Sequence, residues 1–78
     1  MKIEITNHAK ERMKQYAIDE SLLVEALENP HSKSESYANR IIYSKRLNGH
    51  ILRAIVEESE GIKKVITLYK ARSGRYEI

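Results

Sequence analysis

The sequence predicts an α+β fold in which two N-terminal helices pack on an antiparallel sheet of three to four strands. Two observations lead to this prediction. Apolar residues recur at helical spacing over residues 7–30, whereas from residue 37 onward they alternate with polar residues, as in half-buried strands. The pair Asn48-Gly49, the strongest turn signal in the chain, lies inside the alternating part. Two helices followed by a meander of strands form a two-layer α+β sandwich.

The length and composition of the chain indicate one small globular domain over residues 1–78. A chain of 78 residues has room for a single modest core. Apolar residues make up 41% and charged residues 32% of the chain, which is typical of a folded protein. Because there is no cysteine, neither a disulfide nor a thiolate metal site can stabilise the fold.

The sequence contains no segment with the composition of a membrane span or a signal peptide. The longest apolar runs are three residues, and the N-terminal MKIEITNH contains no apolar stretch. We therefore expect a cytoplasmic protein that makes no contact with membranes.

The first helix is predicted over residues 7–16. Its apolar residues Ala9, Met13 and Tyr16 are spaced so that they share one helical face. Ahead of it, residues 2–5 (KIEI) alternate and fit a short edge strand.

The second helix is predicted between Asp19 and Asn29-Pro30. Asp19 can cap its N-terminus, and Ile18 and Leu23 have the spacing of a hydrophobic staple around that cap. The pair Asn29-Pro30 ends the helix, since proline cannot continue it.

The rest of the chain is predicted to form a loop and then strands. The polar stretch HSKSES, residues 31–36, fits a loop. Asn48-Gly49 predicts a two-residue type I′ turn that pairs Leu47 with His50. The three predicted strands cover residues 37–47, 50–57 and 63–72.

The two turns predict which residues face each other across the strands. The Asn48-Gly49 turn places Ser44 opposite Arg53 and Tyr43 opposite Ala54. The second turn, ESEG, is looser and is taken to pair Glu57 with Lys63. That register gives two further predicted pairs: Arg53 with Thr67, and Ile51 with Tyr69.

These registers sort the strand residues onto two faces of the sheet. The face that is apolar enough to receive the helices carries Ile41, Tyr43, Leu52, Ala54, Val56, Ile66 and Leu68. The opposite face carries Arg40, Ser44, Arg46, Arg53, Thr67 and Tyr69 among Ile42, Ile51, Ile55 and Val65. An arginine in the middle of the central strand is unusual, because β-branched residues are favoured there.

The charge of the chain is unevenly distributed. The net charge is +3, residues 19–28 are acidic, and most cations lie in residues 40–53 and 63–75. This distribution favours a polyanion or an acidic protein as partner of the C-terminal half. The alternative is that the charge serves only solubility.

His8 and Arg12 lie on one flank of the apolar stripe of the first helix. We expect their side chains at the seam between helix and sheet. There a histidine can exchange protons near neutral pH, and an arginine can bind a phosphate through two N–H groups. The alternative is that His8 has no role and that Arg12 pairs with Glu11 or Glu4.

A second group of candidates, Arg53, Thr67 and Tyr69, is predicted on the face away from the helices. A guanidinium, a hydroxyl and a phenol can together hold a phosphate and a stacked base, which are the needs of single-stranded RNA recognition. The alternative is an Arg–Tyr pair that only covers the sheet.

The tail YKARSGRYEI supplies the third group, Arg72, Arg75 and Tyr76. Gly74 would allow the chain to turn and bring Arg75 and Tyr76 back over the sheet. A solvated end and a fourth strand over residues 75–78 are the alternatives.

Several kinds of site can be excluded from the residue types. The three histidines, His8, His31 and His50, lack the spacing of metal ligands, so neither a metal nor a cofactor is expected. There is no Gly-rich phosphate loop, nucleophile elbow or apolar carboxylate pair. The remaining His, Arg, Thr and Tyr fit RNA cleavage without a metal, in which the 2′-hydroxyl attacks the neighbouring phosphate.

The chain also resembles a family. Four segments carry the likeness: ITNHAKERMKQYAID, NPH, NRIIYSKRLNGHILRAIVEE and VITLYKARSGRY. They resemble a largely uncharacterised bacterial and archaeal domain-of-unknown-function family whose first helix reads T-x-H-A-x-E-R-M. That family is grouped with the RelE/ParE-like toxins, within the barnase, colicin and RelE-type ribonuclease folds. The likeness extends from Ile5 to Tyr76.

The resemblance implies a RelE/ParE-like toxin of a toxin–antitoxin pair that acts as a metal-independent endoribonuclease, an mRNA interferase. Its partners would be a small acidic antitoxin protein and RNA, either free or on the ribosome. Carried over to this chain, the expected catalytic residues are His8, Arg53, Arg72 and Tyr76. The expected substrate-binding residues are Arg12, Thr67, Tyr69 and Arg75.

Two alternatives to an enzyme are compatible with the same residues. The first is a non-catalytic binding module, either ParE-like or regulatory, because ParE-like relatives keep the fold and bind their target without cleaving RNA. The second is a plain scaffold that forms a homodimer through the sheet edge or the acidic second helix.

Overall fold

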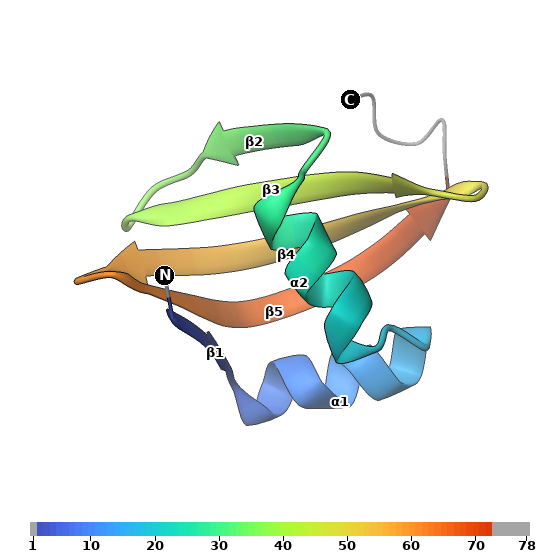
Figure 1. Cartoon of the computed structure of the whole chain (residues 1–78), viewed down its shortest axis with the longest axis horizontal. Coiled ribbons are helices and arrows are strands. Elements are labelled where there is room, and N and C mark those ends of the chain that lie inside the picture. The colour runs from blue at the N-terminus through green and yellow to red at the C-terminus, as the bar shows by residue number, and fades with distance from the viewer. Residues whose placement is uncertain (1, 73–78) are drawn as a thin grey trace.

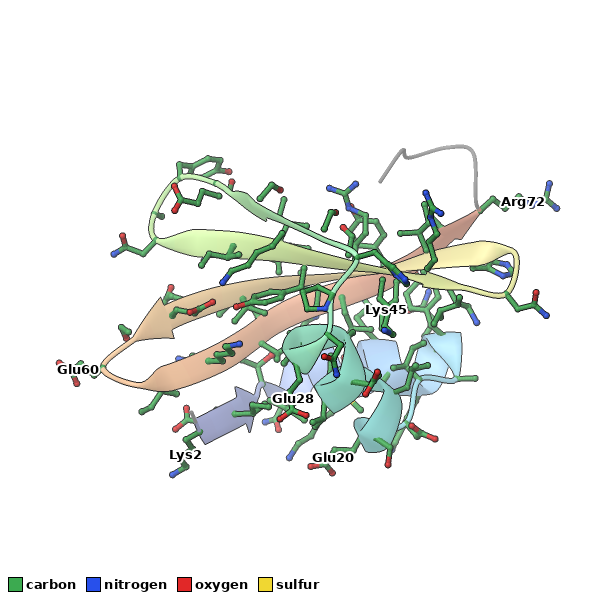
Figure 2. The ribbon with its side chains drawn as sticks, turned by 45° about the horizontal axis from the view of Figure 1, so that its top comes forward. Lys2, Glu20, Glu28, Lys45, Glu60 and Arg72 are labelled. Atoms are coloured by element: carbon green, nitrogen blue, oxygen red, sulfur yellow. The ribbon has the colours of Figure 1, made fainter. Side chains whose placement is uncertain are left out.

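The computed structural model of the protein describes residues 2–72. It contains two helices and five strands in one mixed sheet. The elements are β1 (Lys2–Ile5), α1 (Asn7–Tyr16), α2 (Glu20–Glu28), β2 (Ser32–Glu35), β3 (Arg40–Leu47), β4 (His50–Ser59) and β5 (Ile62–Arg72). The strand order is β1-β5-β4-β3-β2, and both helices lie on the same face of the sheet (Figures 1 and 2).

The α+β class is confirmed, but the predicted antiparallel meander of three to four strands is wrong in two respects. β1 joins the sheet parallel to β5, with Ile5 opposite Val65, so the sheet is mixed. Residues 31–36, predicted as a loop, contain the edge strand β2, which runs antiparallel to β3. The alternative fourth strand over residues 75–78 lies outside the described residues.

The polar sequence of β2 explains why it could not be recognised as a strand. Its residues Ser32–Glu35 read SKSE, and three of the four are exposed. A strand at the edge of a sheet needs no alternation of apolar residues when its backbone pairs with a neighbour on one side. β2 therefore depends on its ladder with β3 rather than on buried side chains.

The second helix forms as its sequence predicts. The Asp19 carboxylate accepts a hydrogen bond from the Leu22 backbone N–H at 2.8 Å and so caps the N-terminus. Ile18 and Leu23, the predicted hydrophobic staple, are both buried in the core.

Lysines from the sheet stabilise the C-terminal end of α2, which has no basic residue in its own last turn. Lys45 Nζ donates to the Asn29 carbonyl at 3.0 Å and lies 3.6 Å from a Glu25 carboxylate oxygen. Lys63 Nζ donates to the Leu27 carbonyl at 3.4 Å. Cations at this end donate hydrogen bonds to carbonyls that the helix leaves unpaired, and they interact favourably with the negative pole of the helix dipole.

The two hairpin turns differ from their predicted types. The first turn pairs Leu47 with His50, as predicted. Among its two central residues only Gly49 has a positive φ, 77°, so the predicted type I′ turn is wrong. In the second turn Glu60 and Gly61 both have positive φ, 50° and 76°, which makes it a tight two-residue turn.

The pairing of β4 with β5 contains a β-bulge at Ile66. Val56 faces Val65, whereas the preceding residue Ile55 faces Thr67, so Ile66 is the extra residue in β5. Together with the tight second turn, which pairs Glu57 with Lys64 instead of Lys63, the bulge changes the predicted register.

Two predicted cross-strand pairs are consequently wrong. Arg53 lies opposite Tyr69 rather than Thr67, and Ile51 lies opposite Ala71 rather than Tyr69. The register set by the tight turn also changes the predicted faces of two neighbours. Val65, predicted on the outer face, is fully buried in the core, and Ile66, predicted in the core, is not part of it.

Thr6 connects this bulge to the start of α1. Its hydroxyl donates to the Ile66 carbonyl at 3.0 Å and accepts from the Ala9 backbone N–H at 3.1 Å. Its own N–H donates to the Val65 carbonyl at 3.2 Å. A bulge interrupts the ladder and leaves a backbone group without a partner in the neighbouring strand. Here that group is the Ile66 carbonyl, and the hydroxyl of the cap residue Thr6 binds it.

The core lies between the helices and the sheet. Its buried residues are Ala9, Ile18, Leu23, Ala26, Leu27, Tyr43, Leu52, Ala54, Val56, Val65 and Leu68. Figure 1 shows α1 alongside β5 past the point where β1 ends, and α2 crossing the sheet. No helix in the described part of the chain is long and apolar enough to cross a membrane.

Tyr43 is the largest buried side chain of this core and is surrounded by charged groups. Its hydroxyl donates to the Glu58 carboxylate, and the ammonium groups of Lys33 and Lys63 lie 5.3 and 4.8 Å from its ring centre. Burial raises the pKa of the Tyr43 phenol well above its usual range, and the hydrogen bond to Glu58 and the charge of Glu58 raise it further.

We expect Ala17→Gly to stabilise the protein. Ala17 ends α1 in the left-handed region, with φ 55°, and the Ile18 N–H donates to the Met13 carbonyl at 2.8 Å around it. An alanine is strained there and a glycine is not, so the free energy of unfolding should rise by about 0.5–1 kcal/mol. Urea unfolding measures this change in the free energy of unfolding. Lys14→Gly, at a helical position, is the matched control and should lower stability by about 0.5–1 kcal/mol. Equal losses from both changes would contradict the expectation.

We expect the Thr6 hydroxyl to hold the bulge in place. Thr6→Val keeps the shape but removes both hydroxyl hydrogen bonds, so it should lower the free energy of unfolding by roughly 1–3 kcal/mol. Thr6→Ser keeps the hydroxyl and should stay within about 1 kcal/mol of the natural protein.

Urea unfolding and the NOEs between Arg53 and Tyr69 measure this effect. Asp19→Ala, which removes the cap of α2, is the matched control: it should lower stability by about 1 kcal/mol and leave those NOEs unchanged. A Thr6→Val protein as stable as Thr6→Ser would contradict the proposed role of the hydroxyl.

Candidate nucleic-acid interface

The outer face of the sheet, the face away from both helices, carries the first candidate site. The registers place alternate residues of each strand on it, and no helix of the described chain covers it. Its polar and charged residues are Lys2, Glu4, Ser32, Ser34, Arg40, Ser44, Arg46, Arg53, Glu57, Ser59, Lys64, Thr67 and Tyr69.

A polar row crosses four strands of this face. Ser32, Ser44, Arg53 and Tyr69 lie directly opposite one another in β2, β3, β4 and β5. The Arg53 guanidinium carbon lies 6.0 Å from the centre of the Tyr69 ring, within cation–π range. Arg53 is half-buried and Ser44 is buried, so the centre of the row is partly shielded from solvent.

Apolar side chains flank the polar row on both sides. On one side Ile42, Ile55 and Thr67 form the next row, and on the other Ile51 lies between Arg46 and Ala71. Ile51 is only 2% exposed although it faces away from the helices. Bases can contact the half-buried Ile42 and Ile55, whereas Ile51 is closed to a ligand, and the arginines can contact phosphates.

The two sides of the molecule differ in charge. Among the described residues the outer face carries five cations, Lys2, Arg40, Arg46, Arg53 and Lys64, against the two carboxylates of Glu4 and Glu57. The opposite side is mixed: α2 exposes Glu20, Glu25 and Glu28, whereas α1 exposes Lys10 and Lys14. A face of one sign attracts a ligand of the other sign, so the outer face favours an anion.

His8 and Arg12 are not brought to this face. Both lie on α1, which covers the other face of the sheet, and the Arg12 side chain forms hydrogen bonds within that helix. Its Nη1 donates to Gln15 Oε1 at 2.8 Å and its Nε to His8 Nε2 at 3.5 Å. The alternative partners Glu11 and Glu4 make no hydrogen bond or ion pair with Arg12 in the described residues.

The predicted tail residues are only partly placed. Arg72 ends β5 opposite His50, a position that alternation assigns to the helix side rather than to the face of Arg53. Arg75 and Tyr76 lie outside the described residues. The predicted catalytic set is therefore split, with Arg53 on one face and His8 and Arg72 on the other.

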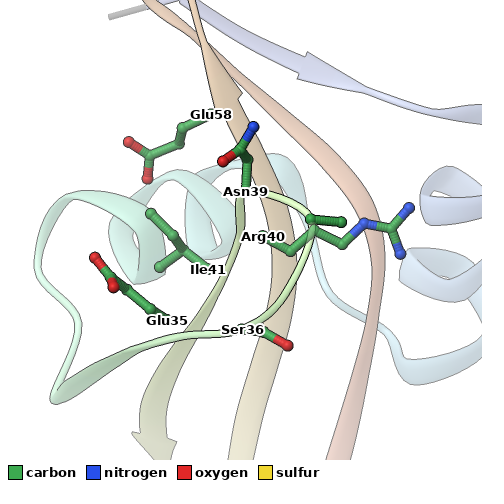
Figure 3. A pocket seen from close by; sticks show the side chains of 7 residues that line it. Glu35, Ser36, Asn39, Arg40, Ile41 and Glu58 are labelled. Carbon is green, nitrogen blue, oxygen red and sulfur yellow. The ribbon is translucent and has the colours of Figure 1, made fainter.

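A hollow of about 370 Å³ at the β2–β3 turn is a separate feature. Figure 3 shows the carboxylates of Glu35 and Glu58 on one side of it beside Ile41, while Arg40 points the other way. Glu35, Ile41 and Glu58 occupy helix-side positions of their strands, whereas Arg53 lies on the outer face, so this hollow does not form a site together with Arg53. Within residues 2–72 no group of three or more histidine, aspartate or glutamate side chains could hold a metal ion.

Sequence reasoning missed three residues that shape the candidate site. Ser32 was hidden in a strand predicted as a loop, and Ser44 had no predicted neighbour beyond Arg53. Thr6 sets the register that brings Arg53 and Tyr69 together. Its signal was present, since a threonine directly before a helical stripe is typical of an N-cap.

Comparison with known proteins identifies the family of the chain. The chain matches none of the curated proteins, and it matches none of the solved structures. Residues 5–70, most of the chain, match the model of a family described only as a domain of unknown function, DUF4258. The expected membership in an uncharacterised family is thereby confirmed, and the protein belongs to the DUF4258 family.

Proposed function

We propose that the protein is the toxin of a toxin–antitoxin pair and that it acts on RNA as a metal-independent endoribonuclease of the RelE/ParE-like kind. One observation carries the proposal. Arg53 stands on the central strand beside Tyr69, on a basic face that the helices leave uncovered. A guanidinium next to an aromatic ring suits a phosphate followed by a stacked base.

The proposed chemistry needs few groups. The 2′-hydroxyl oxygen attacks the adjacent phosphorus, the bond to the 5′-oxygen breaks, and the products are a 2′,3′-cyclic phosphate and a 5′-hydroxyl. A base removes the proton of the 2′-hydroxyl and an acid protonates the leaving 5′-oxygen. Arg53, with Arg46 on the same face, would stabilise the charge that develops on the phosphate oxygens.

The acid and base are assigned by resemblance to Tyr76 and His8. Tyr69 would stack a base, with Thr67 in the neighbouring row, and Arg75 would hold the RNA backbone. Arg12 and Arg72 lie on the helix side, so they would contact only RNA that continues around the sheet. The expected protein partner is a small acidic antitoxin, for which the basic outer face offers complementary charge.

A non-catalytic binding module is the second candidate function. The observation that favours it is the separation of His8 and Arg12, on the helix side, from Arg53 on the outer face. In that case the outer face would bind its target by charge and shape, and no cleavage would occur.

Expression in a bacterial host tests the proposal. The natural protein should arrest growth and shorten mRNA. Arg53→Ala should reduce RNA cleavage by about 10²–10³-fold, because it removes a donor to the charged transition state. Tyr76→Phe should reduce it as well. Lys10→Ala, an exposed cation on α1, is the matched control and should keep full toxicity.

The RNA products distinguish the two candidate functions. Incubation with mRNA in a reconstituted translation mixture should yield fragments with 2′,3′-cyclic phosphate ends, as the proposed attack requires. Growth arrest without fragments, unchanged by His8→Ala, would favour the binding module. Unaffected growth and intact mRNA, or an Arg53→Ala protein as active as the natural one, would contradict the endoribonuclease.

A further inference from the structure

We propose that two copies of the chain associate through β2, edge to edge, to form one continuous sheet. This inference does not depend on the proposed function. β2 is the last strand of the sheet, and no described strand pairs with its other side. Its residues Lys33, Ser34 and Glu35 are exposed, so their edge is accessible to a second strand.

The hydrogen bonding of β2 determines which backbone groups face outward. The Ser36 N–H donates to the Arg40 carbonyl at 2.7 Å across the hairpin. Because bonded positions alternate along an antiparallel ladder, Ser34 and Ser32 also direct their backbone groups toward β3. The backbone groups of Lys33 and Glu35 consequently point to the open edge.

A two-fold axis at Ser34 satisfies those groups with a second copy. In an antiparallel pairing about this axis, Lys33 faces Glu35 of the second copy and Glu35 faces its Lys33. The outward backbone groups of both residues then bond to each other, and each side-chain pair joins opposite charges. Strand β2 is thus complementary to itself, as a symmetric dimer interface must be.

The neighbouring registers are less favourable. An axis at Lys33 would place two lysines opposite each other, and an axis at Glu35 would do the same with two glutamates. In a register shifted by one residue, the outward backbone groups of one copy would face residues of the other copy whose backbone groups already bond to β3. The charge pattern of β2 therefore selects the Ser34 axis.

An exposed aromatic side chain adds to the same surface. Tyr37 is 84% exposed, and it is the large apolar side chain most open to solvent in the described chain. It follows β2 by two residues. Continuing the Ser34 register brings Tyr37 next to His31 of the second copy, where its ring would be partly buried. Association would cover an exposed aromatic ring that the monomer leaves in water.

The dimer has a defined geometry. Directly opposed residues lie on the same face of a sheet, so the two outer faces would lie on one side of the shared sheet and all four helices on the other. The contact is small, and we expect a dissociation constant of roughly 10–500 µM, as for transient interfaces below about 1,200 Å².

Sedimentation velocity of the full chain between ~10 µM and ~1 mM tests the proposal. The natural protein should shift from a 9.1 kDa monomer toward a dimer. Lys33→Glu and Glu35→Lys each place like charges opposite each other at both symmetric pairs. Each should therefore raise the dissociation constant at least about tenfold. Glu35→Pro removes an outward N–H and should abolish the dimer while leaving the bonds to β3 intact.

Mixing the variants gives the decisive comparison. Lys33→Glu and Glu35→Lys are complementary to each other, so an equimolar mixture should regain dimer, as should the double variant that exchanges both charges. This recovery also shows that the single variants are folded. Lys10→Glu is the matched charge control and should dimerise like the natural protein.

Three results would overturn the proposal: a monomer at ~1 mM, a dimer that persists in Glu35→Pro and in both charge reversals, or a mixture that sediments like its separate components. The second result would place the contact elsewhere, with the acidic face of α2 the next surface to test.

Discussion

One extra residue in β5, Ile66, determines which side chains meet on the outer face. The bulge at Ile66 brings Tyr69, rather than Leu68, opposite Arg53 and so places the Tyr69 ring on the outer face. The Thr6 hydroxyl binds the carbonyl of Ile66 and caps α1 at the same time, so a contact across 60 positions of sequence fixes both the helix and the register. Two residues of the opening segment ITNHAKERM are therefore structural: Thr6 caps the helix, and Ala9 is fully buried under it.

The other candidate residues of the opening segment do not lie near Arg53. His8 and Arg12 lie on the helix side and contact each other, whereas Arg53 and Tyr69 lie on the outer face. A catalytic centre that uses both would have to reach around the sheet. The outer face by itself has the charge and the aromatic group for binding RNA, and this is the part of the proposed function that the described residues support most directly.

The sequence was informative where periodicity and turn residues agree. Apolar spacing located both helices, and Asn48-Gly49 set the pairing of Ser44 with Arg53 correctly. Prediction failed where backbone hydrogen bonds decide the structure. The polar strand β2 carries no apolar alternation, and a bulge such as that at Ile66 leaves no mark in a run of β-branched residues. The tight turn at Glu60-Gly61 moved Val65 into the core, and the bulge moved the register by one more residue. Thr67 and Tyr69 therefore keep their predicted face but face other partners than predicted.

Chemical-shift mapping with a short single-stranded RNA tests the central claim, that the outer face around Arg53 and Tyr69 binds RNA. Titration of ¹⁵N-labelled protein should shift the amide signals of Ser44, Arg53 and Tyr69 in a saturable manner, and the shifts should weaken as salt rises because phosphate contacts are screened. The amides of the acidic helix α2, on the other face of the sheet, should not move. Shifts confined to α2, or none that saturate, would contradict the account.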